Sequence, residues 1–227
     1  MANGCWAAGW QASAVEYPWM LAPASHIATT ARSLLGWHVA ANGVTLRLTE
    51  VEAYQGQGED PASHAHRGRT TRNAVMFGPA GHAYVYFVFG MHWCLNITCG
   101  RPGEAAAVLL RAGSVVGGLD AARNRRPTVA ADRDLARGPA RLVMTLGIDV
   151  TANGTSLVDG SGPILLTPPD RRVARRAIAS GPRVGVAAAH DVPWRFWLEG
   201  DPTVSPYRRH APRIAKNVNA SSGPASQ

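Results

Sequence analysis

Lysine is nearly absent from this sequence of 227 residues. Of the 23 basic residues, 22 are arginine, and Lys216 near the C-terminal end is the single lysine. Arginine keeps its proton at physiological pH and binds phosphate oxygens through two N–H groups at once. The sequence therefore favours contacts with phosphate over chemistry that needs a free amine.

Cysteine is scarce, and Cys5, Cys94 and Cys99 are not spaced as paired metal ligands. Their odd number argues against a disulfide framework, and their spacing argues against a zinc ribbon. The histidines around His64 and His66 do not form an HExxH motif, and they lie in an arginine-rich stretch that repels a dication. We therefore expect no metal and no other cofactor.

Long apolar runs are also missing, since no stretch reaches the roughly 18 residues that a membrane-spanning helix needs. The first residues lack a basic segment followed by an apolar one, so we expect a soluble intracellular protein, cytoplasmic or associated with the nucleoid. A hydrophobic content of 46% is enough for a core, and a net charge of +8 suggests a polyanionic partner. We expect a loose lead-in over 1–18, one domain over 19–214 and a disordered tail over 215–227.

The pattern of short helices and strands predicts an α+β domain around an antiparallel or mixed β-sheet. Helical spacing of apolar residues indicates short packing helices over 25–35 and 138–147, and Asn42-Gly43 is typical of a hairpin turn. Further strands are predicted for residues 105–110, ending at Arg111, and for residues 163–166, 183–188 and 194–198.

One predicted strand carries acidic residues where an apolar face is expected. With a period of two, Leu46, Leu48, Glu50, Glu52 and Tyr54 fall on one side of it. Ordinary alternation keeps apolar residues on the buried face, yet this face ends in two carboxylates and a phenol. The end of the strand is therefore a candidate site.

Two apolar runs, residues 83–89 and 92–97, are joined through Gly90 and read as a protruding β-hairpin. Aromatic rings stack on nucleic-acid bases at about 1–3 kcal/mol each. Tyr54 and Tyr86 are candidates for the walls of a base pocket, and Phe89 is a candidate wedge at the hairpin tip. The alternative is that these rings belong to the core.

A carboxylate beside such a pocket can activate water for attack on a sugar carbon as the base departs. Glu50 and Glu52 are the candidates for this role. The alternative is an ordinary strand carboxylate paired with an arginine such as Arg47.

Several ordered blocks stand out, namely Thr49-Glu50-Val51-Glu52-Ala53-Tyr54, Asp60-Pro61-Ala62-Ser63-His64, Arg72-Asn73, Tyr84-Val85-Tyr86, Gly90-Met91, Cys94-Leu95-Asn96-Ile97 and Val108-Leu109-Leu110-Arg111-Ala112. Together they resemble the methylpurine (3-methyladenine) DNA glycosylase family, and the likeness extends over about residues 20 to 210. The resemblance implies removal of alkylated or deaminated purines from double-stranded DNA by base flipping and hydrolysis, as a step of base excision repair.

The resemblance also implies roles for single residues. Glu52 matches the general base, and Arg111 matches its partner in holding the water. The base pocket is matched by Tyr54 and His64 as walls, by Tyr86 as the stacking residue opposite, and by Asn96 as the residue that rejects the amino group of guanine. Phe89 and its neighbour Met91 match the hairpin tip that intercalates into DNA.

A glycosylase that also cuts the strand needs an amine nucleophile, and Lys216 alone does not supply one in the predicted domain. We therefore expect a monofunctional, monomeric enzyme that leaves an abasic site. The alternative is a non-catalytic basic module that binds nucleic acid. That reading leaves Glu50 and Glu52 unexplained, because two carboxylates facing a phosphate-binding cleft would weaken binding.

Overall fold

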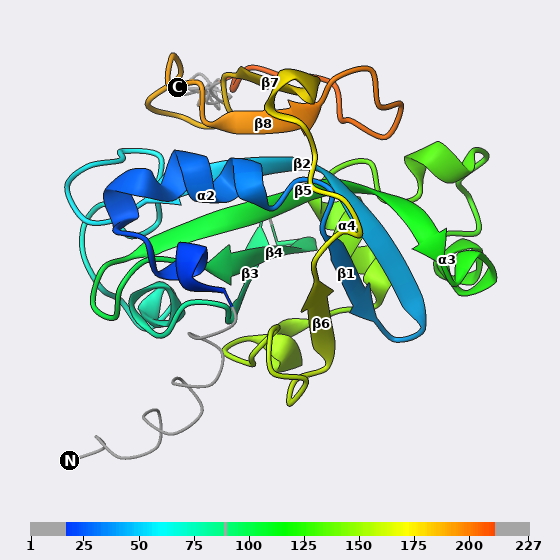
Figure 1. Cartoon of the computed structure of the whole chain (residues 1–227), viewed down its shortest axis with the longest axis horizontal. Coiled ribbons are helices and arrows are strands. Elements are labelled where there is room, and N and C mark those ends of the chain that lie inside the picture. Colours follow the sequence, from blue (N-terminus) through cyan, green and yellow to red (C-terminus); the bar gives the residue numbers. More distant parts are fainter. Residues whose placement is uncertain (1–16, 89, 212–227) are drawn as a thin grey trace, which may run out of the picture.

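One antiparallel sheet organises the part of the chain that the computed structural model describes, residues 17–88 and 90–211 (Figure 1). Its main path runs in the order β3-β4-β5-β2-β1-β6, and β8 pairs with both β2 and β7. The strands are β1 (His38–Ala41), β2 (Val44–Gln55), β3 (Ala83–Val88), β4 (His92–Thr98), β5 (Ala106–Gly117), β6 (Ile164–Thr167), β7 (Ile178–Gly181) and β8 (Arg195–Leu198).

Within the described ranges, three short α-helices accompany the sheet, namely α2 (Ile27–Ser33), α3 (Leu119–Arg125) and α4 (Pro139–Leu146). In the view of Figure 1, α2 lies in front of β2 and β5, and β7 and β8 lie above them. The 3-10 helices are η1 (Pro18–Leu21), η2 (Ala24–His26), η3 (Ala74–Phe77), η4 (Asp132–Asp134), η5 (Val150–Ala152) and η6 (Arg175–Ala177). None of the helices in the described ranges is long and apolar enough to cross a membrane. The predicted α+β domain with short packing helices is confirmed.

The longest strands, β2 and β5, form the centre of the sheet. β5 follows one edge of β2 along its whole length, while the other edge of β2 pairs first with β1 and then with β8. The turn between β1 and β2 is the predicted Asn42-Gly43 dipeptide, and both of its residues have positive φ (49° and 77°). Such a turn matches the twist of the two strands.

Three offsets interrupt the pairing of β2 with β5, one between Thr45 and Leu46 and two compensating ones around Glu50. Leu48 pairs with Gly113 and Glu50 with Ala112, so Thr49 is an extra residue in β2. Glu50 pairs with Ala112 and Val51 with Leu110, so Arg111 is an extra residue in β5. Each offset is a β-bulge, which changes the face to which the following side chains point.

The bulge corrects one prediction. Leu46 and Leu48 lie in the main core, and beyond the bulge Val51 and Ala53 take over the core positions. The proposed single face from Leu46 to Tyr54 is therefore wrong, because the extra Thr49 reverses the alternation. The acidic end of the supposed face arises from this reversal.

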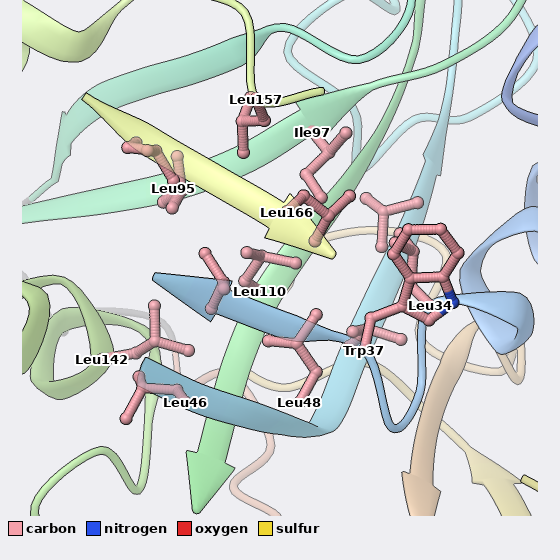
Figure 2. Close-up of a cluster of buried hydrophobic side chains, with 14 of the residues drawn as sticks. Leu34, Trp37, Leu46, Leu48, Leu95, Ile97, Leu110, Leu142, Leu157 and Leu166 are labelled. Carbon is pink, nitrogen blue, oxygen red and sulfur yellow. The ribbon is translucent and has the colours of Figure 1, made fainter. Parts of the chain in front are cut away.

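The main core lies between α2, α4 and the inner face of the sheet. Figure 2 shows leucines from separate elements converging there, including Leu34 from α2, Leu48 from β2, Leu142 from α4 and Leu166 from β6. All four are almost completely buried. Burial of each such side chain contributes about 1.5–3 kcal/mol, so the core fixes the position of β2 and β5.

The predicted hairpin is confirmed as β3 and β4, which pair from Ala83 with Ile97 to Val88 with His92. At its tip, the side chain of Met91 is 68% exposed. Phe89 lies outside the described residues. So do residues 1–16 of the predicted lead-in and the predicted tail over 215–227.

Several element boundaries differ from the prediction. β5 does not end at Arg111 but continues to Gly117, because the first half of β2 pairs with it. Residues 183–188 form a loop instead of a strand, since the backbone N–H of Val184 donates to a carboxylate and not to a neighbouring strand. β7 was not predicted, because its sequence Ile178–Gly181 is short, contains glycine and is only partly buried.

Candidate active site

A cavity of about 530 Å³ opens on the side of the sheet away from the main core. Side chains from β2, β3, β4 and β5 line it, together with the start of α4 and the loop at residues 184–187. The lining includes five residues that the sequence analysis singled out, namely Tyr54, His64, Tyr86, Asn96 and Arg111. The fold thus brings together residues from four strands and one loop.

Glu52 lies beside this cavity, with a side chain that is completely buried. One carboxylate oxygen, Oε1, accepts a hydrogen bond from the backbone N–H of Val184 at 2.7 Å. The other, Oε2, accepts from the hydroxyl of Tyr54 at 2.9 Å and from Nη1 of Arg111 at 3.3 Å. A carboxylate has about four acceptor positions. Donors in the described part of the chain occupy three, which leaves one for a further donor such as water.

Glu50 is also completely buried, and both of its carboxylate oxygens accept hydrogen bonds from other partners than those of Glu52, apart from Arg111. Its Oε1 accepts from Arg111 Nε at 2.9 Å, from Arg195 Nε at 2.6 Å and from the hydroxyl of Ser205, while Oε2 accepts from the Ser205 backbone N–H. Burial alone would raise the pKa of Glu50, but the guanidiniums of Arg111 and Arg195 outweigh it and lower that pKa. Glu50 is therefore an ionised structural partner of two arginines.

Arg111 joins the two carboxylates. Burial by itself would lower its pKa, but Glu52 and then Glu50 raise it, so the guanidinium stays charged. Its position follows from the bulge, because Arg111 is the extra residue of β5 opposite Glu50 and Val51. The expected contact between Arg111 and Glu52 is present, and the contact with Glu50 is the shorter of the two.

Aromatic rings form two sides of the cavity. The imidazole of His64 meets the ring of Tyr86 edge-on at 4.6 Å between centroids, and its Nδ1 lies 2.9 Å from the hydroxyl of Tyr84. Burial raises the pKa of Tyr84 to about 12 and that of Tyr86 well above its ordinary value. Burial of the imidazole, and then the nearby Arg72, lower the pKa of His64. These three aromatic side chains are therefore uncharged near neutral pH.

The ring of Tyr54 packs against a buried cation, the guanidinium of Arg183. Burial, followed by the charge of Glu52, raises the pKa of Tyr54 well above the ordinary value, so the phenol remains a hydrogen-bond donor. The guanidinium of Arg183 lies 4.7 Å from the centroid of the ring, and Arg183 forms a bidentate ion pair with Asp60 at 2.6 and 2.8 Å. This pair fixes the loop that carries Val184.

Asn96 is buried on β4, where its side-chain Nδ2 donates to the backbone carbonyl of Tyr84 at 3.0 Å. This bond fixes the orientation of the amide. The neighbouring Cys94 also lines the cavity, and burial raises the pKa of its thiol to about 11. The thiol is therefore protonated and unreactive at neutral pH.

Several contributors to the site escaped the sequence analysis as functional residues, among them Asp60, Tyr84, Arg183, Val184, Arg195 and Ser205. Arg195 is 145 residues from its partner Glu50, and Arg183 is 123 residues from Asp60. No local pattern links residues so far apart. The one available signal was the number of arginines in an apolar context, as in Trp194-Arg195-Phe196.

A buried carboxylate next to an aromatic cavity, in a basic protein, is an arrangement typical of the class of enzymes that act on a flat ring. The comparison with protein families agrees with this class. The family model for methylpurine-DNA glycosylase (MPG) matches residues 22–202.

Bacterial relatives are similar over most of their length, and each carries the name "Putative 3-methyladenine DNA glycosylase". The relative from Nocardia farcinica is 56% identical over 185 residues, which cover 80% of this chain and 87% of the relative. The one from Streptomyces avermitilis is 51% identical, covering 75% and 80%. The one from Mycobacterium tuberculosis (strain H37Ra) is 46% identical, covering 83% and 93%. The chain belongs to the methylpurine-DNA glycosylase family.

Proposed function

We propose that this DNA glycosylase flips alkylated or deaminated purines out of double-stranded DNA and hydrolyses the N-glycosidic bond with a water activated by Glu52. The observation that carries the proposal is the free acceptor position of a buried carboxylate beside the aromatic cavity. A water in that position gives its proton to Glu52 as its oxygen bonds to the sugar carbon. The bond between that carbon and the purine nitrogen breaks, and an abasic site remains.

The other contacts of Glu52 support this role. Arg111, Tyr54 and the N–H of Val184 fix both oxygens, so the carboxylate cannot turn away from the cavity. The negative charge of Glu52 also stabilises the positive charge that develops on the sugar as the base leaves. Arg111 acts as the partner that orients Glu52.

We propose that the damaged purine enters between Tyr54 and Tyr86, with His64 at the rim and Asn96 at the floor. Both phenols stay neutral because their pKa values are raised. An alkylated purine that carries a positive charge gains cation–π attraction from such rings, by about 0.5–2 kcal/mol. Extruding the base costs least when its pairing is already weakened by damage. Phe89 and Met91 fill the gap that the base leaves in the duplex.

The enzyme is proposed to be monofunctional, since the chain has a single lysine, Lys216, and no lysine lines the cavity among the residues that the structure describes. We also propose that it acts as a monomer in the cytoplasm, at the nucleoid where its DNA substrate lies. A molar mass of 24.0 kDa in light scattering would agree with the monomer, and twice that mass would contradict it.

The test is single-turnover base release from duplex oligonucleotides that carry hypoxanthine or, separately, a methylated purine. Wild type is compared with Glu52→Gln in the presence of a chelator, because the proposed mechanism needs no metal. We expect release by the variant to fall by about 10²–10⁴-fold, the usual contribution of a general base, with DNA binding retained. Glu59→Gln makes the same chemical change on an exposed loop seven residues away, and it should release base at the wild-type rate.

Other outcomes would point elsewhere. Salt-sensitive binding without release of either base would favour a non-catalytic module that binds nucleic acid. Loss of release and binding together in Glu52→Gln would indicate that Glu52 supports the fold. Release that stops with chelator and returns with one metal would contradict the proposed mechanism.

A further inference from the structure

Four buried charges lie next to one another where β2, β5 and β8 meet. Glu50 and Glu52 are both completely buried, while Arg111 and Arg195 are 6% and 4% exposed. Arg111 contacts both carboxylates, at 2.9 Å and 3.3 Å, and Arg195 contacts Glu50 at 2.6 Å. The two negative and two positive charges sum to zero, so we name these four residues the neutral cluster.

The hydrogen bonds divide the positive charge of Arg111 and Arg195 unequally between Glu50 and Glu52. Glu50 accepts the Nε–H groups of both Arg111 and Arg195, whereas Glu52 accepts one longer bond from a terminal nitrogen of Arg111. If Glu50 were neutral, the whole charge of Arg111 would act on Glu52, and Arg195 would have no carboxylate partner in the described part of the chain. A carboxylate that faces more positive charge accepts a proton less readily. Glu50 therefore competes with Glu52 for the charge of Arg111.

Other polar groups also face Glu52, and they differ in charge. Those that contact Glu52 or interact with it electrostatically are Tyr54 on β2, Tyr86 on β3, Cys94 on β4, Arg111 on β5, and Arg183 and the Val184 N–H in the loop. The phenols and the thiol are neutral near pH 7, since burial raises their pKa values. Arg183 is paired with Asp60. The balance at Glu52 is therefore set by the neutral cluster.

We propose that Glu50 and Arg195 are positioning residues that set how readily Glu52 accepts a proton, by controlling how much of the charge of Arg111 acts on it. This inference rests on the proposed function, in which Glu52 is the general base. Neither residue lines the cavity, so both act through Arg111. Glu50 draws part of the charge of Arg111 away from Glu52, and Arg195 limits that effect because it also pairs with Glu50.

The test is the pH dependence of single-turnover release of hypoxanthine, a neutral base. Glu50→Gln leaves the cluster with a net charge of +1, so the acid limb of the pH–rate profile should move to lower pH by about one unit. Arg195→Gln leaves a net charge of −1 and should move it to higher pH by about the same amount. The double variant is neutral again, and its acid limb should return to the wild-type position.

Matched controls separate charge from structure. Ser205→Ala removes a neutral hydrogen-bond partner of Glu50 and should leave the acid limb in place. Glu50→Asp keeps the charge and should also retain the wild-type limb. Thermal unfolding and binding of lesion-containing duplex show whether each variant is folded. A purely structural role would lower the rate equally at every pH.

Acid limbs that stay in place in both single variants, or that move in the same direction, would overturn the inference. If one single variant is too unstable to assay, the other decides, because an unmoved limb in that variant is enough to reject the proposal. A wild type that releases no base would instead defeat the proposed function. The two failures are therefore distinguishable.

Discussion

Asp60 fixes the chain segments that support the candidate site. Its two oxygens accept from both terminal nitrogens of Arg183, and they also accept from the backbone N–H groups of Gln55 and Ala62. Arg183 in turn donates to the carbonyl of Ala53 and packs on the ring of Tyr54. One buried carboxylate thus ties together the end of β2, the following loop and the loop that carries Val184.

Asp60→Asn is expected to lower the free energy of unfolding by about 3–5 kcal/mol, because removing one partner of a buried ion pair leaves the other charge uncompensated. Urea unfolding measures this loss. The matched control is Asp132→Asn, which breaks an ion pair with Arg123 that is about half exposed on both sides and should leave the urea midpoint unchanged. Equal losses in the two variants would contradict this account of Asp60.

At the scale of elements, the β3–β4 hairpin presents an apolar tip. Met91 is 68% exposed and Phe87 is 43% exposed, although both are large apolar residues. Exposed apolar side chains at a hairpin tip contribute little to folding, so their position beside the cavity suggests a role in contact with DNA.

Met91→Ala should therefore change the free energy of unfolding by less than about 0.5 kcal/mol, as surface substitutions usually do. The same variant should bind a lesion-containing duplex more weakly and release hypoxanthine more slowly, because less of the gap in the duplex is filled. Fluorescence anisotropy and single-turnover release measure the two effects. Val116→Ala removes another exposed apolar side chain, 52% exposed on β5, and serves as the control. Indistinguishable binding by both variants would argue against intercalation by Met91.

The sequence predicted elements well where local chemistry decides the structure. Asn42-Gly43, the glycine-linked hairpin and the helix Pro139–Leu146 before Gly147 all carry such signals, and all three are confirmed. The prediction from sequence was wrong where contacts between residues far apart in the chain decide the structure. The backbone of Val184 donates to Glu52, 132 residues earlier in the chain, and this contact keeps residues 183–188 out of the sheet.

The candidate site likewise has a part that the sequence predicted and a part that depends on contacts between distant residues. The resemblance to a family pointed to Glu52, Tyr54, His64, Tyr86, Asn96 and Arg111, and the fold places all six in or beside one cavity. The charge balance around Glu52 was not predictable, because Arg195 reaches Glu50 through the pairing of β8 with β2. That pairing depends on the sheet as a whole.

At the scale of the whole molecule, the net charge of +8 is carried almost entirely by arginine. The aromatic side chains of the cavity, His64, Tyr84 and Tyr86, are uncharged near neutral pH, so we expect attraction to phosphate and stacking on the base to use different side chains. The first step is expected to be sensitive to salt and the second is not.

Affinity for undamaged duplex should therefore fall linearly on a plot of log affinity against log salt concentration. The rate of base release at saturating enzyme should stay constant over the same salt range, because stacking and water activation take place inside the cavity. Binding titrations and single-turnover kinetics on one set of buffers test both statements. A release rate that falls in parallel with affinity would show that phosphate contacts also act on the chemical step.

The offsets at Thr49 and Arg111 make the number of residues in the central strands as important as their identity. Thr49 adds one residue to β2 and Arg111 adds one to β5, and the core positions Val51 and Ala53 depend on this count. Inserting one residue after Thr49 would exchange these core residues with Glu50 and Glu52, and would place two carboxylates in the apolar interior. Among related chains, we therefore expect substitutions along β2 to be tolerated far better than single-residue insertions or deletions. A change of length in one strand would require a matching change in the other.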